Sequence, residues 1–221
     1  MTRFSRPLSV FVYQDVLCAW CYLAEARLAP LREEFKPLLR WKTRPYPLRV
    51  NEAQPTGEEL STWAKEIRLA RREPEGARLK ADLWTGGDPP RSSVPALMAL
   101  EAARLQGPTA RALLGKALQR AGLEQGINVC RTDVVFELAS RVGLQMNRFS
   151  AAFTSPETKR LILEEHRIAD DRGIRGVPTL VVGGRWMISG LRETAEYREH
   201  LRQCLEKAGL AGGGHPEPTV H

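Results

Sequence analysis

The stretch from Leu8 to Tyr22 reads LSVFVYQDVLCAWCY and joins a strand pattern to a pair of cysteines. Residues Leu8–Gln14 are rich in β-branched and aromatic side chains and are apolar on both alternations, which is typical of a buried strand. From Trp20 to Phe35 the apolar spacing becomes helical. We therefore expect Cys18 and Cys21 at a strand-to-helix junction.

That position favours redox chemistry. The first turn of a helix carries unpaired backbone N–H groups and the positive end of the helix dipole, and both would stabilise a thiolate at Cys18. A stabilised thiolate is nucleophilic at neutral pH. Cys21 follows nearly one turn later, so its sulfur can reach Cys18 and resolve a mixed disulfide. The pair predicts dithiol–disulfide exchange.

Two other interpretations of a C-x-x-C pair have less support from the sequence. Half of a zinc site would need partners from Cys130, Cys204 or a histidine, and none of these stands in paired spacing with another ligand. Two inert buried cysteines are the other alternative, but the junction argues against them. The sequence predicts no metal and no organic cofactor.

The rest of the chain divides into a strand-containing part and a helical part. Leu39–Thr43 alternates like a second strand and ends before Pro45. From about residue 57 to 165 the apolar side chains recur at helical spacing, beginning with a capping box at Thr56–Glu59. Strands return at 179–182 and 185–188 around Gly183-Gly184, a turn suited to a tight hairpin, and a last helix covers about 193–208. Pro30 is expected to kink or break the first helix.

These patterns predict an α/β fold with a mixed central sheet and a large all-helical insertion. We expect residues 1–56 and 166–208 to form the sheet domain, residues 57–165 the helical insertion domain, and residues 209–221 a disordered tail.

Composition limits the function classes. The chain has 221 residues and a net charge of +7, but no zinc-finger or RNA-binding signature accompanies the charge, so no nucleic-acid partner is expected. No apolar run approaches the roughly 18 residues of a membrane helix, and no signal-peptide pattern precedes the first strand. We expect a cytoplasmic protein without a membrane partner; the sequence assigns no oligomeric state.

Three separated motifs resemble the DsbA-like branch of the thioredoxin superfamily, and most closely its FrnE-like members. The residues that carry the resemblance are Asp15 and Cys18–Tyr22 near the start, Ser93–Leu97 in the middle, and Gly173–Leu180 with Ile188–Gly190 near the end. It spans about residues 8 to 207, with the helical block between the two halves of the fold.

The resemblance implies a thioredoxin fold and a protein disulfide oxidoreductase. Cys18 would be the attacking thiol and Cys21 the buried resolving one. Pro178 would be cis beside them, and the backbone of Val177 would pair with an extended substrate segment. Trp20 would be a platform for substrates, a tuner of the redox potential or a plain hydrophobic cover.

Substrates would be protein or small-molecule thiols and disulfides, with glutathione as a possible co-substrate. Ala19 departs from the family, whose members usually carry proline there, and this dipeptide tunes thiolate stability. Related groups with this fold, the 2-hydroxychromene-2-carboxylate isomerases and kappa-class glutathione transferases, have a lone serine in place of the cysteine pair. A glutathione-dependent isomerase and a redox-switched binding or chaperone module remain alternatives.

Several other polar residues are not assigned a role in catalysis. Asp15 lies three residues before Cys18, where it could move protons or shape the helix entry. His166 is expected to be a surface or packed residue, while Cys130 and Cys204 are expected to be small buried side chains.

Overall fold

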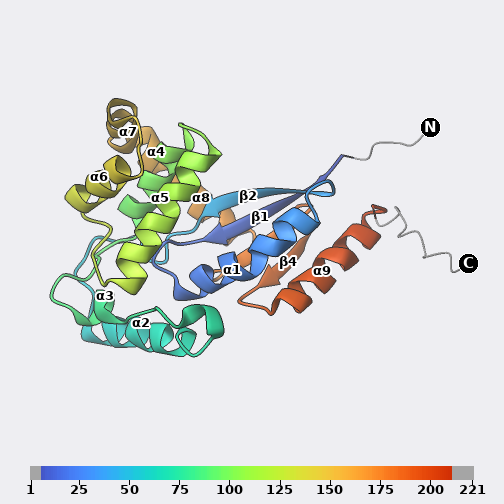
Figure 1. The fold of residues 1–221 in the computed structure, drawn as a ribbon, viewed down its shortest axis with the longest axis horizontal. Helices are drawn as coiled ribbons and strands as arrows, with labels where there is room; N and C mark the ends of the chain where they lie inside the picture. Colours follow the sequence, from blue (N-terminus) through green and yellow to red (C-terminus); the bar gives the residue numbers. More distant parts are fainter. Residues whose placement is uncertain (1–5, 211–221) are drawn as a thin grey trace, which may run out of the picture.

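A computed structural model describes residues 6–210 as one four-stranded sheet with helices around it (Figure 1). The strands are β1 (Leu8–Gln14), β2 (Leu39–Pro45), β3 (Thr179–Val182) and β4 (Trp186–Ser189), in the order β2-β1-β3-β4. β1 is parallel to β2 and antiparallel to β3, and β3 is antiparallel to β4. The predicted mixed sheet is confirmed, and residues 211–221 of the predicted tail lie outside the described part.

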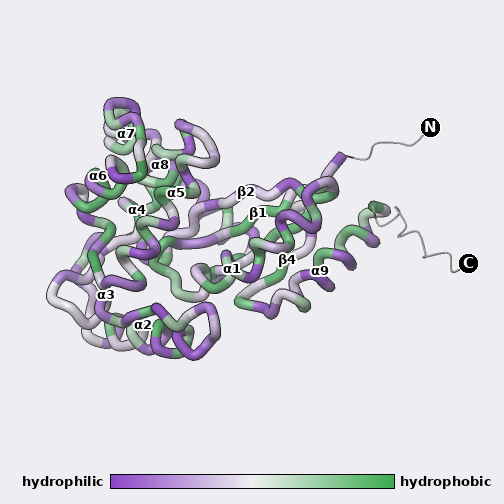
Figure 2. Tube along the Cα trace, viewed as in Figure 1, coloured by the Kyte–Doolittle hydropathy of each residue, from purple (hydrophilic) through white to green (hydrophobic). Residues whose placement is uncertain are grey.

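Helices α1 (Ala19–Glu34) and α9 (Thr194–Lys207) lie side by side on one face of this sheet (Figure 1). Their apolar faces join β1 and β3 in one core that includes Val12, Leu28, Leu180 and Leu201. Along α9 the hydropathy alternates between hydrophobic and hydrophilic residues, as expected for a helix with one buried face (Figure 2). The opposite face of the sheet packs on the end of α8 through Ala169.

Helix α1 does not end at Pro30, contrary to the expected break. Proline removes only one backbone hydrogen bond, and the carbonyl left free belongs to Ala26, which is exposed to water as Pro30 is. The buried side chains of Leu28 and Leu31 on the other face hold the helix on both sides of the proline.

The helical insertion between β2 and β3 packs around a second core, which it shares with Leu17, Ala19 and Leu23 around the start of α1. Its elements are α2 (Gly57–Ala70), the 3-10 turn η1 (Pro74–Gly76), α3 (Asp82–Thr85), α4 (Val94–Arg104), α5 (Pro108–Gln119), the π turn η2 (Arg120–Glu124), α6 (Thr132–Arg141), α7 (Met146–Phe153) and α8 (Pro156–Asp171). α8 contacts both α4 and β2. Because this single helix crosses the expected boundary between residues 165 and 166, the domain division stays a prediction.

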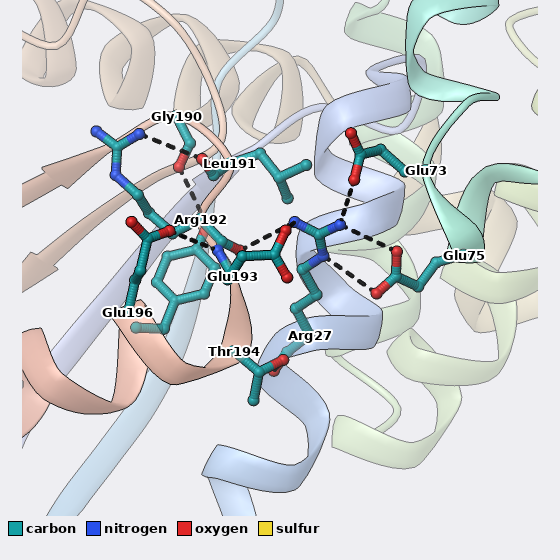
Figure 3. Close-up of polar contacts among 10 residues, drawn as sticks. Arg27, Glu73, Glu75, Gly190, Leu191, Arg192, Glu193, Thr194 and Glu196 are labelled. Carbon is teal, nitrogen blue, oxygen red and sulfur yellow. Dashed lines mark hydrogen bonds and ion pairs between the residues drawn. The ribbon is translucent and has the colours of Figure 1, made fainter.

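Arg27 joins the insertion to the two helices on the sheet (Figure 3). Its guanidinium, with only 4% of the side chain exposed, lies 2.6 Å from Glu73, which precedes η1, and 3.1 Å from Glu75 within it. On the other side it lies 2.9 Å from Glu193, the residue before α9. These carboxylates raise the pKa of Arg27 further above its ordinary value. One buried cation thus fixes α1 between α9 and the insertion.

Candidate functional site

Cys18 is the residue that caps the N-terminus of α1. Its Sγ accepts a hydrogen bond from the backbone N–H of Cys21 at 3.2 Å. The β1 strand ends at Gln14, so the short link to α1 places the thiol just beyond the end of a central strand. The predicted strand-to-helix junction is therefore present, and the helix N-terminus donates to the sulfur as that geometry requires.

Cys21 lies beneath Cys18 on the first turn of α1 and is only 1% exposed. Burial, the hydrogen bond with Cys18 and the nearby carboxylate of Asp15 raise the pKa of Cys21 well above its ordinary value. All four cysteines are free thiols in this structure. Of the pair, Cys18 lines a cavity that reaches the surface, whereas Cys21 does not.

The loop before β3 meets Cys18 from the other half of the chain. The Val177–Pro178 peptide bond is cis, the geometry that the sequence resemblance implies. The Sγ of Cys18 donates to the carbonyl oxygen of Val177 at 3.5 Å. The loop is tied in place by two bonds of 2.8 Å, from the Gly190 N–H to the Pro178 carbonyl and from the Thr179 hydroxyl to the Gly176 carbonyl.

A cavity of about 310 Å³ opens beside Cys18 and is lined mainly by apolar side chains. One wall comes from the α1 junction and the Val177 loop, and the other from the insertion, where Trp63 and Trp84 pack with ring centroids 4.6 Å apart. Aromatic walls of this kind accept apolar side chains of a ligand.

Trp20 spans the two walls of this cavity. Its indole N–H donates to the Glu66 carboxylate on α2 at 2.7 Å. The side chain is half-buried and lines the cavity together with Cys18. Sequence reasoning selected Trp20 but missed Glu66, Trp63 and Trp84, because nothing in their spacing links them to residues more than 40 positions away.

Asp15 is more deeply embedded than a turn residue. Only 1% of it is exposed, and its carboxylate accepts from the backbone N–H groups of Leu17 at 2.8 Å and Leu48 at 2.7 Å. Burial raises the pKa of Asp15, while hydrogen bonds from Ser93, Leu17 and Leu48 oppose that rise. The carboxyl therefore joins the cysteine loop to the segment after β2 and contributes negative charge near Cys21.

The remaining candidates lie away from the cavity that Cys18 lines. Burial raises the pKa of Cys204, which lies on α9 and packs in the core as expected, and of Cys130, which precedes α6 and is only partly buried rather than fully buried as expected. His166 stacks on Tyr46 with centroids 4.8 Å apart and lies 3.6 Å from Asp170. Within residues 6–210 no group of three or more His, Cys, Asp or Glu side chains is placed to hold a metal ion.

No helix of the described residues combines the length and the apolar character needed to cross a bilayer.

A family model described as a DSBA-like thioredoxin domain matches residues 9–202 of the chain. Two curated relatives are named ClpXP adapter protein SpxH. The one from Halalkalibacterium halodurans is 26% identical over 212 residues, covering 91% of this chain and 67% of the relative. The one from Shouchella clausii is 26% identical over 186 residues, covering 80% of this chain and 58% of the relative. The chain thus spans about two thirds or less of these relatives' length.

Three solved structures share the fold at low sequence identity. A candidate protein disulfide isomerase from Nitrosomonas europaea superposes with a TM-score of 0.79 at 22% identity, covering 94% of this chain and 100% of the other. The cytosolic disulfide reductase DsbM from Pseudomonas aeruginosa, solved with GSH, gives 0.66 at 22% identity, covering 90% and 99%. A 2-hydroxychromene-2-carboxylate isomerase gives 0.62 at 17% identity, covering 92% and 100%.

Proposed function

Because this chain belongs to the family of DSBA-like thioredoxin domains, we propose that it exchanges disulfides with thiol substrates through Cys18 and Cys21. The observation that carries the proposal is the position of Cys18. Its sulfur is the N-cap of α1, lines the cavity, and lies 3.5 Å from the Val177 carbonyl. An attacking thiol needs donors around its sulfur and a path to substrate. The Cys21 N–H supplies a donor, and the cavity leads to the sulfur although only 5% of Cys18 is exposed.

The proposed reaction has two exchange steps. The Cys18 thiolate attacks one sulfur of a substrate disulfide, a Cys18–substrate disulfide forms, and the other substrate sulfur leaves as a thiolate. Cys21 then gives up its proton and attacks Cys18, which forms the Cys18–Cys21 disulfide and releases the second substrate thiolate. The substrate gains two electrons and the pair loses two. The reverse sequence oxidises a substrate dithiol.

The raised pKa of Cys21 assigns the two thiols different roles in this scheme. A buried thiol that keeps its proton does not compete for the substrate disulfide. Once a mixed disulfide occupies Cys18, loss of the hydrogen bond and negative charge at that sulfur removes two of the causes that raise the pKa of Cys21. The resolving step is then favoured over a second encounter with substrate.

The substrate side of the proposal rests on the Val177 loop and the cavity. An extended segment carrying a cysteine would pair with the backbone of Val177 and place a neighbouring apolar side chain against Trp63 and Trp84. Glutathione is a small thiol that would use the same approach as a co-substrate. Exchange between thiols needs no metal and no organic cofactor, because the sulfurs themselves carry the electrons.

We place this activity in the cytoplasm. The support is the cytosolic disulfide reductase among the proteins with this fold.

The experiment that tests the proposal is a measurement of the reduction potential of the Cys18–Cys21 couple in graded glutathione buffers, followed by tryptophan fluorescence. Cys21→Ser is the matched control, which can form only a mixed disulfide. A potential near about −120 mV or −180 mV would assign disulfide donation or shuffling, and one near about −270 mV a reductase. Failure of the two thiols to form any disulfide would refute the proposal.

Two other functions are separated by the same variants. A glutathione-dependent isomerase, as in the isomerase that shares this fold, would keep its activity in Cys21→Ser and require bound glutathione. An adapter role, as in the names of the curated relatives, would survive in Cys18→Ser and appear as binding of a partner protein. Loss of disulfide exchange in both Cys18→Ser and Cys21→Ser supports the exchange mechanism instead.

A further inference from the structure

A second cavity, of about 660 Å³, lies between the edge strand β2 and the helices α4, α5 and α8. It shares no lining residue with the cavity beside Cys18. Trp41 and Lys42 reach it from β2, Arg111 from the first turns of α5, and Arg32 from the end of α1. The proposed exchange reaction uses none of these residues.

Several residues that line this cavity carry a buried side-chain donor without a hydrogen-bond partner. In the described part of the protein, four buried side-chain nitrogens have no hydrogen-bond partner. Three of the four, Arg32 Nε, Trp41 Nε1 and Arg111 Nε, belong to residues that line this one cavity. A buried donor without a partner costs free energy, so three around one space indicate that an acceptor belongs there.

Most cations around the cavity already have carboxylate partners. Arg32 pairs with Glu25 at 2.8 Å, Arg104 with Glu101 at 2.5 Å, and Arg44 with Glu165. Two of these carboxylates, Glu101 and Glu165, line the cavity themselves. In these pairs each cation has a carboxylate partner. The cations that have none are therefore the groups available to a ligand.

Arg111 is the cation without a partner. Its guanidinium makes no hydrogen bond and no ion pair with the described residues, although the side chain is only half-exposed and its Nε is shielded from solvent. Burial lowers the pKa of Arg111, which reflects the cost of holding this charge away from water. Lys42, which is exposed on β2, likewise has no carboxylate within ion-pair distance in this part of the chain.

We infer that this cavity binds a small organic anion through a carboxylate or phosphate group held by Arg111. Such a group offers only acceptor oxygens, and the unpartnered groups here are only donors. The guanidinium fork matches two oxygens of one oxyanion. Helix α5 adds to this preference, because it begins at Pro108 on the cavity wall and has no side-chain cap.

The indole N–H of Trp41 provides a direct test. We would titrate the ¹⁵N-labelled protein with inorganic phosphate and, separately, with citrate, at ionic strength held constant with chloride. The Trp41 indole resonance, assigned with Trp41→Phe, is expected to shift and saturate with one of the two probes. The probe that saturates it tells a phosphate-bearing ligand from a carboxylic acid. The Trp20 indole, which already donates to Glu66, is expected to stay in place.

Three variants assign the binding to Arg111. Arg111→Gln is expected to weaken the affinity at least about tenfold, as loss of a charged hydrogen-bonding partner does. Lys116→Gln removes one charge from an exposed position of the same helix and should leave the affinity unchanged. Arg111→Lys keeps the charge but loses the guanidinium fork, so it should weaken binding several-fold. This variant serves as the test if Arg111→Gln does not fold.

The inference is overturned if neither probe saturates the Trp41 shift. It is also overturned if Arg111→Gln or Arg111→Lys binds as tightly as the parent protein. None of these measurements depends on disulfide exchange at Cys18.

Discussion

The sulfur of Cys18 lies 3.5 Å from the carbonyl oxygen of Val177, although 159 positions separate the two residues in the chain. This contact joins the two halves of the fold across the helical insertion. It also places the thiol where a substrate backbone that pairs with Val177 would bring a sulfur into reach. Cys18 is thus expected to be the most reactive of the four cysteines.

Limited iodoacetamide at neutral pH is expected to label Cys18 before the other cysteines. Its sulfur accepts from a backbone N–H at the helix N-terminus, and the 310 Å³ cavity leads to it. Burial raises the pKa of Cys21, Cys130 and Cys204, so these thiols stay protonated and react slowly. Peptide mapping by mass spectrometry over time measures the order. First labelling of Cys130 or Cys204 would contradict the assignment of the attacking thiol.

The stability of the protein is expected to depend on pH through Asp15. Burial raises its pKa in the folded state, so the folded chain holds this proton to higher pH than the unfolded chain. The free energy of unfolding therefore falls as pH rises from the ordinary value of about 4 through the folded pKa. Asp15→Asn lacks this titration. The difference in urea-unfolding free energy, parent minus variant, should fall over that range.

A difference that is flat with pH, or that rises, would show that the hydrogen bonds from Leu17 and Leu48 outweigh burial at Asp15. The far-ultraviolet spectrum of each protein at the start of the series controls for loss of the fold.

Trp20 and Glu66 are expected to be coupled across the cavity walls. The indole N–H donates to the carboxylate at 2.7 Å, and both side chains are half-buried. A double-mutant cycle with Trp20→Phe and Glu66→Gln should give a coupling free energy of about 1 kcal/mol, reduced from a fully buried charged bond by solvent. Chemical denaturation of the four proteins measures it.

The matched control for this cycle pairs Trp20→Phe with Lys65→Gln, since Lys65 is exposed on the same helix. That cycle should close within about 0.3–0.5 kcal/mol. Equal coupling in both cycles would mean that the substitution of Trp20 disturbs α2 as a whole.

Loss of the Arg27 cluster (Figure 3) is expected to destabilise the protein by about 3 kcal/mol. Arg27→Met removes the buried cation and leaves Glu73, Glu75 and Glu193 facing one another, although their partial exposure lets water compensate in part. Arg131→Met is the control, because Arg131 pairs with Asp88 and Asp133 on the surface and its loss should change stability far less than the loss of Arg27. A similar loss of stability in Arg27→Met and Arg131→Met would contradict a special role for Arg27.

Local patterns in the sequence predicted the elements that build the fold. The strand before Cys18, the helix after it, the capping box at Thr56 and the hairpin around Gly183-Gly184 each depend on neighbours within a few positions. Periodicity, capping and turn chemistry act over that range, so a single chain displays them. Of the kink or break expected at Pro30, the break was wrong, because local propensity yielded to burial of the opposite helix face.

The tertiary structure alone decided what surrounds the two thiols. Trp63, Trp84 and Glu66 reach the cavity from the insertion, and the carboxylate of Asp15 accepts a hydrogen bond from Leu48 in the segment after β2. The unpartnered donors of Arg32, Trp41 and Arg111 come from three elements and share one cavity. Burial and charge environment depend on contacts between distant segments, and the sequence of each segment carries no record of which others it will meet. The sequence pointed to the two sulfurs proposed to react, and packing determined their environment.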